Sequence, residues 1–122
     1  MRWHLITMMC VISPMVGCST VSKELDIARL PPPYRVSIHD EGRPISERDI
    51  VAGSQDAQNI TQWLESNKSG WAPTYVTYAP SRIVHGDSFS LNFTNNMCIV
   101  NYDEGQFYKK ANASVLGSLF DK

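Results

Sequence analysis

The chain has 122 residues, of which 43% are hydrophobic and 19% charged, and its 11 Lys and Arg residues nearly balance 12 Asp and Glu residues. This length allows one small domain, and the hydrophobic content argues against a wholly disordered chain. A net charge of -1 lacks the excess of Lys and Arg that a broad nucleic-acid-binding face requires. The composition therefore predicts a small globular protein that does not bind nucleic acid.

The start of the chain differs in composition from the rest. Four of the five Met residues lie in the first 15 positions, and no acidic residue precedes Glu24. Leu5 to Val16 is a mostly apolar run of 12 residues. A helix of that length would be about 18 Å long, which is shorter than the hydrocarbon core of a membrane at about 30 Å. The run therefore predicts a secretory signal rather than a permanent transmembrane span.

The apolar run ends in Met15-Val16-Gly17-Cys18, and Ser19 follows. This tetrapeptide resembles the lipobox of bacterial lipoproteins. The resemblance implies that the Cys18 thiol forms a thioether to diacylglycerol, that a peptidase cleaves between Gly17 and Cys18, and that a further acyl chain such as palmitate joins the freed amine. The acyl chains would then anchor the protein in a membrane. Because Ser19 is not the Asp that commonly retains such proteins in the inner membrane, the resemblance favours the outer membrane, with the protein facing the periplasm.

Two other interpretations of the first residues remain open. An ordinary secretory signal cut at a small residue would leave a soluble periplasmic or secreted protein, and the apolar run could also be a buried element of a cytosolic fold. In a lipoprotein, Cys10 leaves with the signal and Cys18 is lipidated, so Cys98 alone remains in the domain. Its apolar neighbours predict a buried, unreactive thiol.

The lipobox and the prolines divide the chain into three parts. Residues 1–17 are the expected signal peptide, and residues 18–33 are the lipidated Cys followed by a tether. Pro31-Pro32-Pro33 is typical of an extended polyproline II spacer. Residues 34–122 should form the single folded domain.

Apolar and polar residues alternate over 34–39, which predicts a strand, and residues 40–44 have the composition of a turn. Residues 45–51 allow either a short strand or an irregular segment. A helix is expected over 54–67, because Ser54 can cap it and Asp56 suits its positive end. Apolar side chains recur on one side of this helix at spacings of three and four, namely Ala57, Ile60, Trp63 and Leu64.

After residue 70 the period of the apolar pattern changes to two. Short strands separated by turn residues are expected over 74–78, 82–85, 89–93, 97–102 and 106–109, and residues 112–120 could form a closing helix. The predicted fold class is α+β: a short antiparallel meander of about five or six strands, covered on one face by the helix over 54–67 and by a short C-terminal helix.

Catalytic patterns are scarce, and we expect no cofactor and no metal site. His85 and Asp87 flank Gly86, where they could act as a base and its orienting group, although an exposed turn with a hydrogen-bonded His is the favoured explanation. Polar and aromatic residues expected on the wetter face of the sheet could instead offer a partner surface, namely Tyr75, Thr77, Asn92 and Asn101.

Two classes of function therefore compete. The first is a non-enzymatic envelope lipoprotein that acts by protein contact, either as an accessory or pilot subunit or as an inhibitor or immunity-type factor. Its partners would be the membrane, through Cys18, and an envelope or secreted protein. The alternative is a small periplasmic hydrolase or sugar-binding protein that uses His85 and Asp87.

Overall fold

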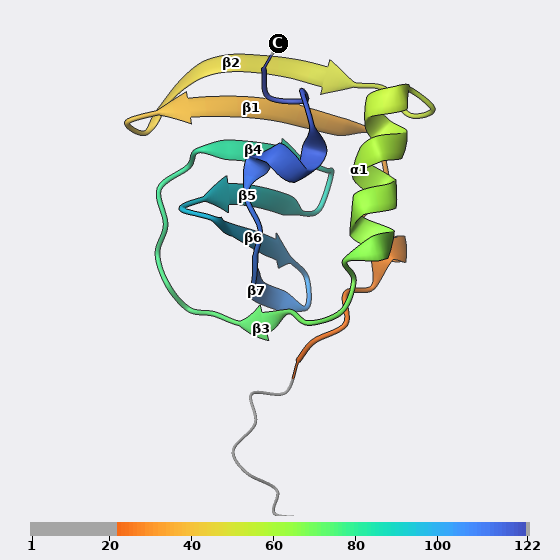
Figure 1. The fold of residues 1–122 in the computed structure, drawn as a ribbon, viewed down its shortest axis with the longest axis vertical. Coiled ribbons are helices and arrows are strands. Elements are labelled where there is room, and N and C mark those ends of the chain that lie inside the picture. The colour runs from red at the N-terminus through yellow and green to blue at the C-terminus, as the bar shows by residue number, and fades with distance from the viewer. Residues whose placement is uncertain (1–21, 122) are drawn as a thin grey trace, which may run out of the picture.

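The computed structural model describes residues 22–121, which form a seven-stranded antiparallel sheet with one α-helix across one face (Figure 1). Two short 3-10 helices lie near the two ends of this part of the chain. The elements in chain order are η1 (Ile27–Arg29), β1 (Tyr34–Asp40), β2 (Arg43–Ile50), α1 (Gln55–Ser66), β3 (Ala72–Pro73), β4 (Arg82–His85), β5 (Ser90–Thr94), β6 (Met97–Tyr102), β7 (Gly105–Lys110) and η2 (Ala113–Leu116).

The strands follow the order β2-β1-β4-β5-β6-β7-β3 across the sheet. The four strands from β4 to β7 form a meander, and the β1–β2 hairpin joins it because β1 pairs with β4. The predicted α+β class is thus confirmed. The sheet contains more strands than expected, since β2 forms where the sequence left the choice open and β3 adds a short pairing at the β7 edge.

One face of the sheet, which we call the helix face, carries the core. A continuous row of apolar residues crosses five strands in register and packs with buried residues of α1: Val36, Val84, Leu91, Val100 and Phe107. The helix begins as predicted, because the Ser54 side chain accepts a hydrogen bond from the Ala57 N–H at 3.2 Å. On the expected apolar side of the helix, Ala57, Ile60 and Leu64 are buried against the sheet, and Trp63 is partly buried.

Residues 23–30 pack onto the domain. The backbone of Lys23 exchanges two hydrogen bonds with that of Trp71, at 2.5 and 3.2 Å, and Leu25 and Leu30 are almost fully buried. The prediction of a tether over 18–33 is therefore wrong from Lys23 onward. The error arose because a 3-10 turn with two widely spaced Leu residues produces neither helical nor strand periodicity. The prolines connect buried Leu30 to buried Tyr34, whose hydroxyl donates to the Leu30 carbonyl at 3.3 Å.

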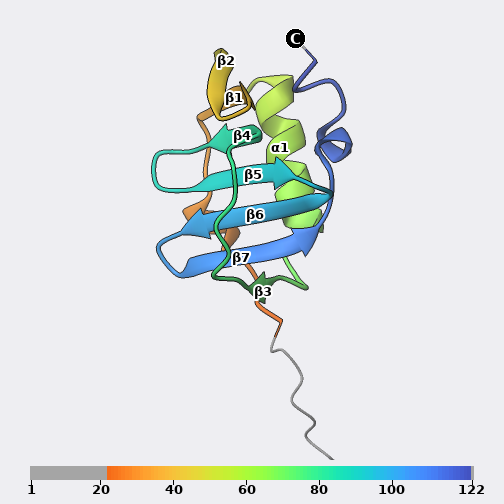
Figure 2. The same cartoon turned by 90° about the vertical axis from the view of Figure 1, so that its left-hand side faces the viewer.

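Residues 74–81, which we call the strap, run across the opposite face of the sheet from β3 to β4 (Figure 2). The strand predicted over 74–78 is therefore wrong. Pairing with β7 stops near Thr74, whose N–H donates to the Gln106 carbonyl at 3.0 Å, and the chain then leaves the sheet edge. Thr74 is buried and Tyr78 is half-buried, but residues 75–77 between them are all exposed, and no neighbouring strand pairs with this segment.

The C-terminal segment closes the core on the helix face. The closing helix expected over 112–120 is only the 3-10 turn η2, which ends at Gly117 with a φ of 62°. The remaining residues form turns that still bury Leu119 and Phe120. Arg48 of β2 fixes this end, because its guanidinium donates to the Leu119 carbonyl at 2.6 Å and pairs with Asp56 of α1 at 3.2 Å.

Candidate functional site

An open groove lies where β1 begins, β2 ends and β4 turns into β5. Its volume is about 570 Å³, and it is bounded by both apolar and charged side chains. Residues from three separate segments form it, because antiparallel pairing places Arg35 opposite both Asp49 and His85. The lining residues used below are Arg35, Glu47, Asp49, Val51, His85 and Asp87.

His85 lies half-buried at the inner side of this groove. Its Nε2 atom is 3.0 Å from the hydroxyl of Ser37, which is fully buried. Burial lowers the pKa of His85 below its ordinary value, and the neighbouring His39 lowers it further, while Glu47 opposes the shift. The surroundings of His85 therefore favour its neutral form. Because its partner Ser37 has no exposed surface, this Ser–His contact cannot present a nucleophile to a substrate.

The turn after β4 separates His85 from Asp87. Gly86 donates its N–H to the Phe89 carbonyl at 2.9 Å, and a Cβ atom on Gly86 would lie 1.9 Å from a ring carbon of Phe89. Only glycine fits this close approach to a buried ring. The turn leaves the Asp87 side chain exposed, whereas the His85 ring bonds to Ser37. The two residues thus share the groove, but the base and orienting group that the sequence suggested are not assembled.

Charge in the groove is predominantly negative. Arg35 pairs with Asp49 at 3.2 Å, and Glu47 and Asp87 add two further carboxylates. Val51 borders these charges with 65% of its surface exposed. An exposed apolar side chain beside three carboxylates and one guanidinium suits a protein segment with apolar and basic residues.

The four residues predicted to form a partner surface divide into three settings. Tyr75 and Thr77 are exposed on the strap, and Asn101 is exposed on β6. Asn101 pairs in register with Gln106, whose side-chain amide donates to the Val76 carbonyl at 3.1 Å, so it borders the strap. Asn92 is only 1% exposed beneath the strap. The prediction is therefore wrong for Asn92, because the alternation that marks a wet face does not reveal that another segment covers it.

Asn92 holds the strap in place instead of binding a partner. Its side-chain oxygen accepts the Ser81 N–H at 3.0 Å, and its amide nitrogen donates to the Ala79 carbonyl at 3.5 Å. The Ser81 carbonyl in turn accepts the His39 N–H of β1 at 2.7 Å. This chain of bonds fixes the point at which the strap enters β4.

Cys98 is buried on β6, as predicted. Burial raises the pKa of its thiol, so the reactive thiolate does not form at neutral pH. Within residues 22–121, no three His, Cys, Asp or Glu side chains lie together as a metal site would require.

The sequence interpretation missed the groove residues Arg35, Glu47, Asp49 and Val51. A signal for them was present, since Glu47 and Asp49 alternate with inward-facing Arg48 and Ile50 along β2. That signal could be used only once residues 43–50 were assigned to a strand beside β1.

The lipobox residues Gly17 and Cys18 lie outside the described part of the chain. From Ser22 to Asp121, no helix is both long and apolar enough to cross a membrane. Comparison of the chain with protein-family models, with curated proteins and with solved structures finds no match in any of the three.

Proposed function

We propose that this chain is a bacterial envelope lipoprotein, anchored through Cys18, that acts by binding another protein in the periplasm. The outer membrane is the proposed location, because Ser19 follows the lipidated position. The partner would be an envelope or secreted protein with a basic segment, and the role that of an accessory subunit or of an inhibitor or immunity-type factor.

The observation that carries the binding role is the groove at the start of β1. Exposed Val51 adjoins three carboxylates there, which matches an apolar and basic segment of a partner. The groove suits contact better than hydrolysis, because the ring nitrogen of His85 that bonds to Ser37 is directed at a buried hydroxyl. Asp87, which the hydrolase hypothesis needs beside His85, lies exposed across the turn.

The anchor is tested first. Bacteria that express the chain and grow with radioactive palmitate should incorporate label into the wild-type protein, whereas Cys18→Ala should remain unlabelled because its side chain cannot form the thioether. Cys10→Ala provides the matched control and should label like the wild type, since Cys10 lies in the segment removed by cleavage. Equal labelling of the wild type and Cys18→Ala would contradict the lipoprotein assignment.

The contact surface is tested by photo-crosslinking in cells. A photoreactive residue at Val51 should yield one discrete adduct, and the same residue at Val115 on η2 should yield none, although Val115 is 43% exposed. In the protein that carries the photoreactive residue at position 51, Glu47→Lys should weaken the adduct, because it replaces a groove carboxylate with a positive charge. Adducts of equal strength at both positions, or no effect of Glu47→Lys, would rule out the groove as the binding surface.

A further inference from the structure

We propose that the end of the domain that carries β3 rests on the lipid bilayer, with Tyr75 and Val76 inserted among the headgroups. This inference rests on the proposed lipid anchor at Cys18. Tyr75 is 96% exposed and Val76 is 54% exposed, so this part of the strap presents apolar surface outside the domain. The occupant is a bilayer of anionic and zwitterionic phospholipids.

The length of chain between the anchor and the domain limits the position of the domain. Five peptide bonds separate Cys18 from Lys23. Fully extended, these residues span at most about 18 Å. Lys23 is not free to move away from the domain, because its backbone is bonded to that of Trp71 in both directions. An acylated Cys18 therefore keeps the Lys23–Trp71 pairing close to the membrane surface.

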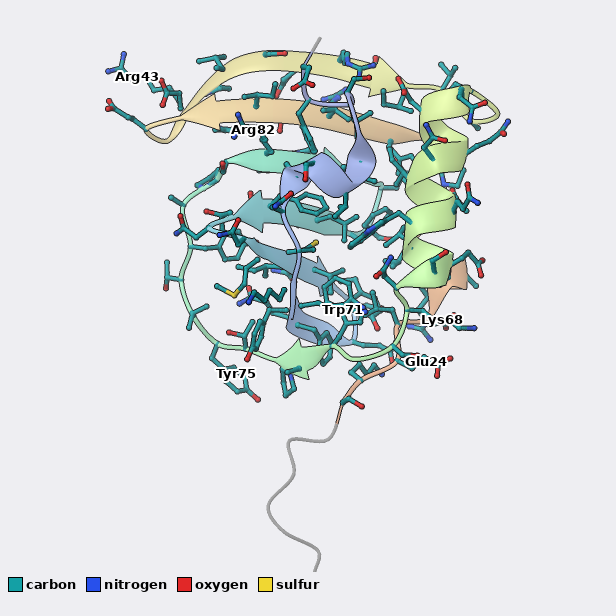
Figure 3. All side chains as sticks on the ribbon, in the orientation of Figure 1. Glu24, Arg43, Lys68, Trp71, Tyr75 and Arg82 are labelled. Carbon is teal, nitrogen blue, oxygen red and sulfur yellow. The ribbon has the colours of Figure 1, made fainter. Side chains whose placement is uncertain are left out.

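Tyr75 is part of the same end of the molecule. It follows Trp71 by only four residues, which is at most about 14 Å of extended chain. Figure 3 shows Tyr75, Glu24 and Lys68 at one end of the domain, where the described part of the chain begins, and Arg43 and Arg82 toward the opposite end. The short connection from Cys18 consequently keeps Tyr75 at the end of the domain that lies nearest the anchor.

The side chains at this end suit a phospholipid interface. Tyrosine places its ring among acyl chains and its hydroxyl among headgroups, and Val76 adds apolar surface. Lys68 is exposed, and its Nζ atom lies 3.9 Å from a carboxylate oxygen of Glu24. A solvent-exposed pair at this distance contributes little to stability, so Lys68 can turn to a lipid phosphate at small cost.

The strap presents Tyr75 on a fixed backbone. The side-chain amide of Gln106 donates to the carbonyls of Thr74 and Val76, at 3.4 and 3.1 Å, on either side of Tyr75. A preorganised backbone reduces the entropy lost when the side chain enters the interface. The same orientation leaves the groove beside β2, at the other end of the sheet order from β3, free to meet a protein in the periplasm.

The test measures membrane contact at two positions by tryptophan quenching. The lipidated mature protein is purified from membranes as Tyr75→Trp or as Ile45→Trp and reconstituted in vesicles of phosphatidylethanolamine and phosphatidylglycerol with brominated acyl chains. Ile45, on β2, is 64% exposed and serves as the matched control. The tryptophans within the domain, Trp63 and Trp71, are common to both variants. Brominated lipid should remove a larger share of the emission of Y75W protein than of I45W protein.

Mass spectrometry of the same samples distinguishes failure of the lipid-anchor proposal from failure of the orientation proposal. A lipidated protein with equal quenching at both positions, or with stronger quenching at position 45, overturns the orientation and leaves the anchor standing. A lipidated protein in which Y75W emission is unquenched because a co-purified protein covers the strap also overturns it. A product without the diacylglycerol mass overturns the anchor and the orientation together.

Discussion

Trp71→Ala should lower the free energy of unfolding by about 3–5 kcal/mol, the usual cost of removing a buried aromatic side chain. Trp71 has no exposed surface, and its indole N–H donates to the Asn67 carbonyl at 2.6 Å. The ring also packs edge-on against Trp63, with centroids 6.3 Å apart. Because a domain of this size has only about 5–15 kcal/mol of stability, this loss is a large part of the total.

The position of Trp71 explains why its removal should weaken contacts in several parts of the domain. Its ring lies between the end of α1 and the sheet, while its backbone holds Lys23 and thereby the N-terminal segment (Figure 3). Urea denaturation of the purified domain measures the change, and Trp71→Phe should fall between Ala and wild type because it keeps a ring without the N–H donor. Tyr75→Ala is the matched aromatic control and should change little, since that side chain is 96% exposed. A wild-type unfolding midpoint for Trp71→Ala would contradict the central role given to this residue.

The elements that the sequence predicted well are those whose signal is local. The helix over 54–67 combined a side-chain cap at Ser54 with apolar residues at helical spacing, and both cause helix formation directly. Residues 97–102 form the expected strand, in which Cys98 and Val100 face the core on the helix face of the sheet. Ile99, on the opposite face, is buried as well. Such patterns need no knowledge of distant neighbours.

The elements that were predicted wrongly depend on contacts between distant parts of the chain. Residues 23–30 look like a tether in isolation, and only their pairing with Trp71 and the burial of Leu25 and Leu30 make them part of the domain. The strap looks like a strand in the sequence. However, pairing with the free edge of β7 ends after the two residues of β3, so the strap has no partner strand. The groove escaped prediction for the same reason, since it forms only after β2 pairs with β1.

Under the proposed orientation, buried Asn92 sets the path of the strap between the membrane end of the domain and β4. Residues of the strap would contact the bilayer near Tyr75, whereas the end of the strap at Ser81 bonds to β1 and leads into β4, the two strands whose opposite ends line the groove. A buried amide is expensive unless it is hydrogen-bonded, so its bonds to Ala79 and Ser81 select one path for the strap across the sheet.

Asn92→Ala should therefore destabilise the domain by about 2–3 kcal/mol, because the Ser81 N–H loses its acceptor and the Ala79 carbonyl loses a donor. Urea denaturation measures the lower free energy of unfolding. In limited proteolysis, the protease should cut the variant first within residues 74–81. Asn101→Ala supplies the matched control on the neighbouring strand, where the side chain is exposed and unfolding should be unchanged. Equal stability of Asn92→Ala and Asn101→Ala would mean that the strap keeps its path without the buried amide, and Gln106 would then be the contact that fixes it.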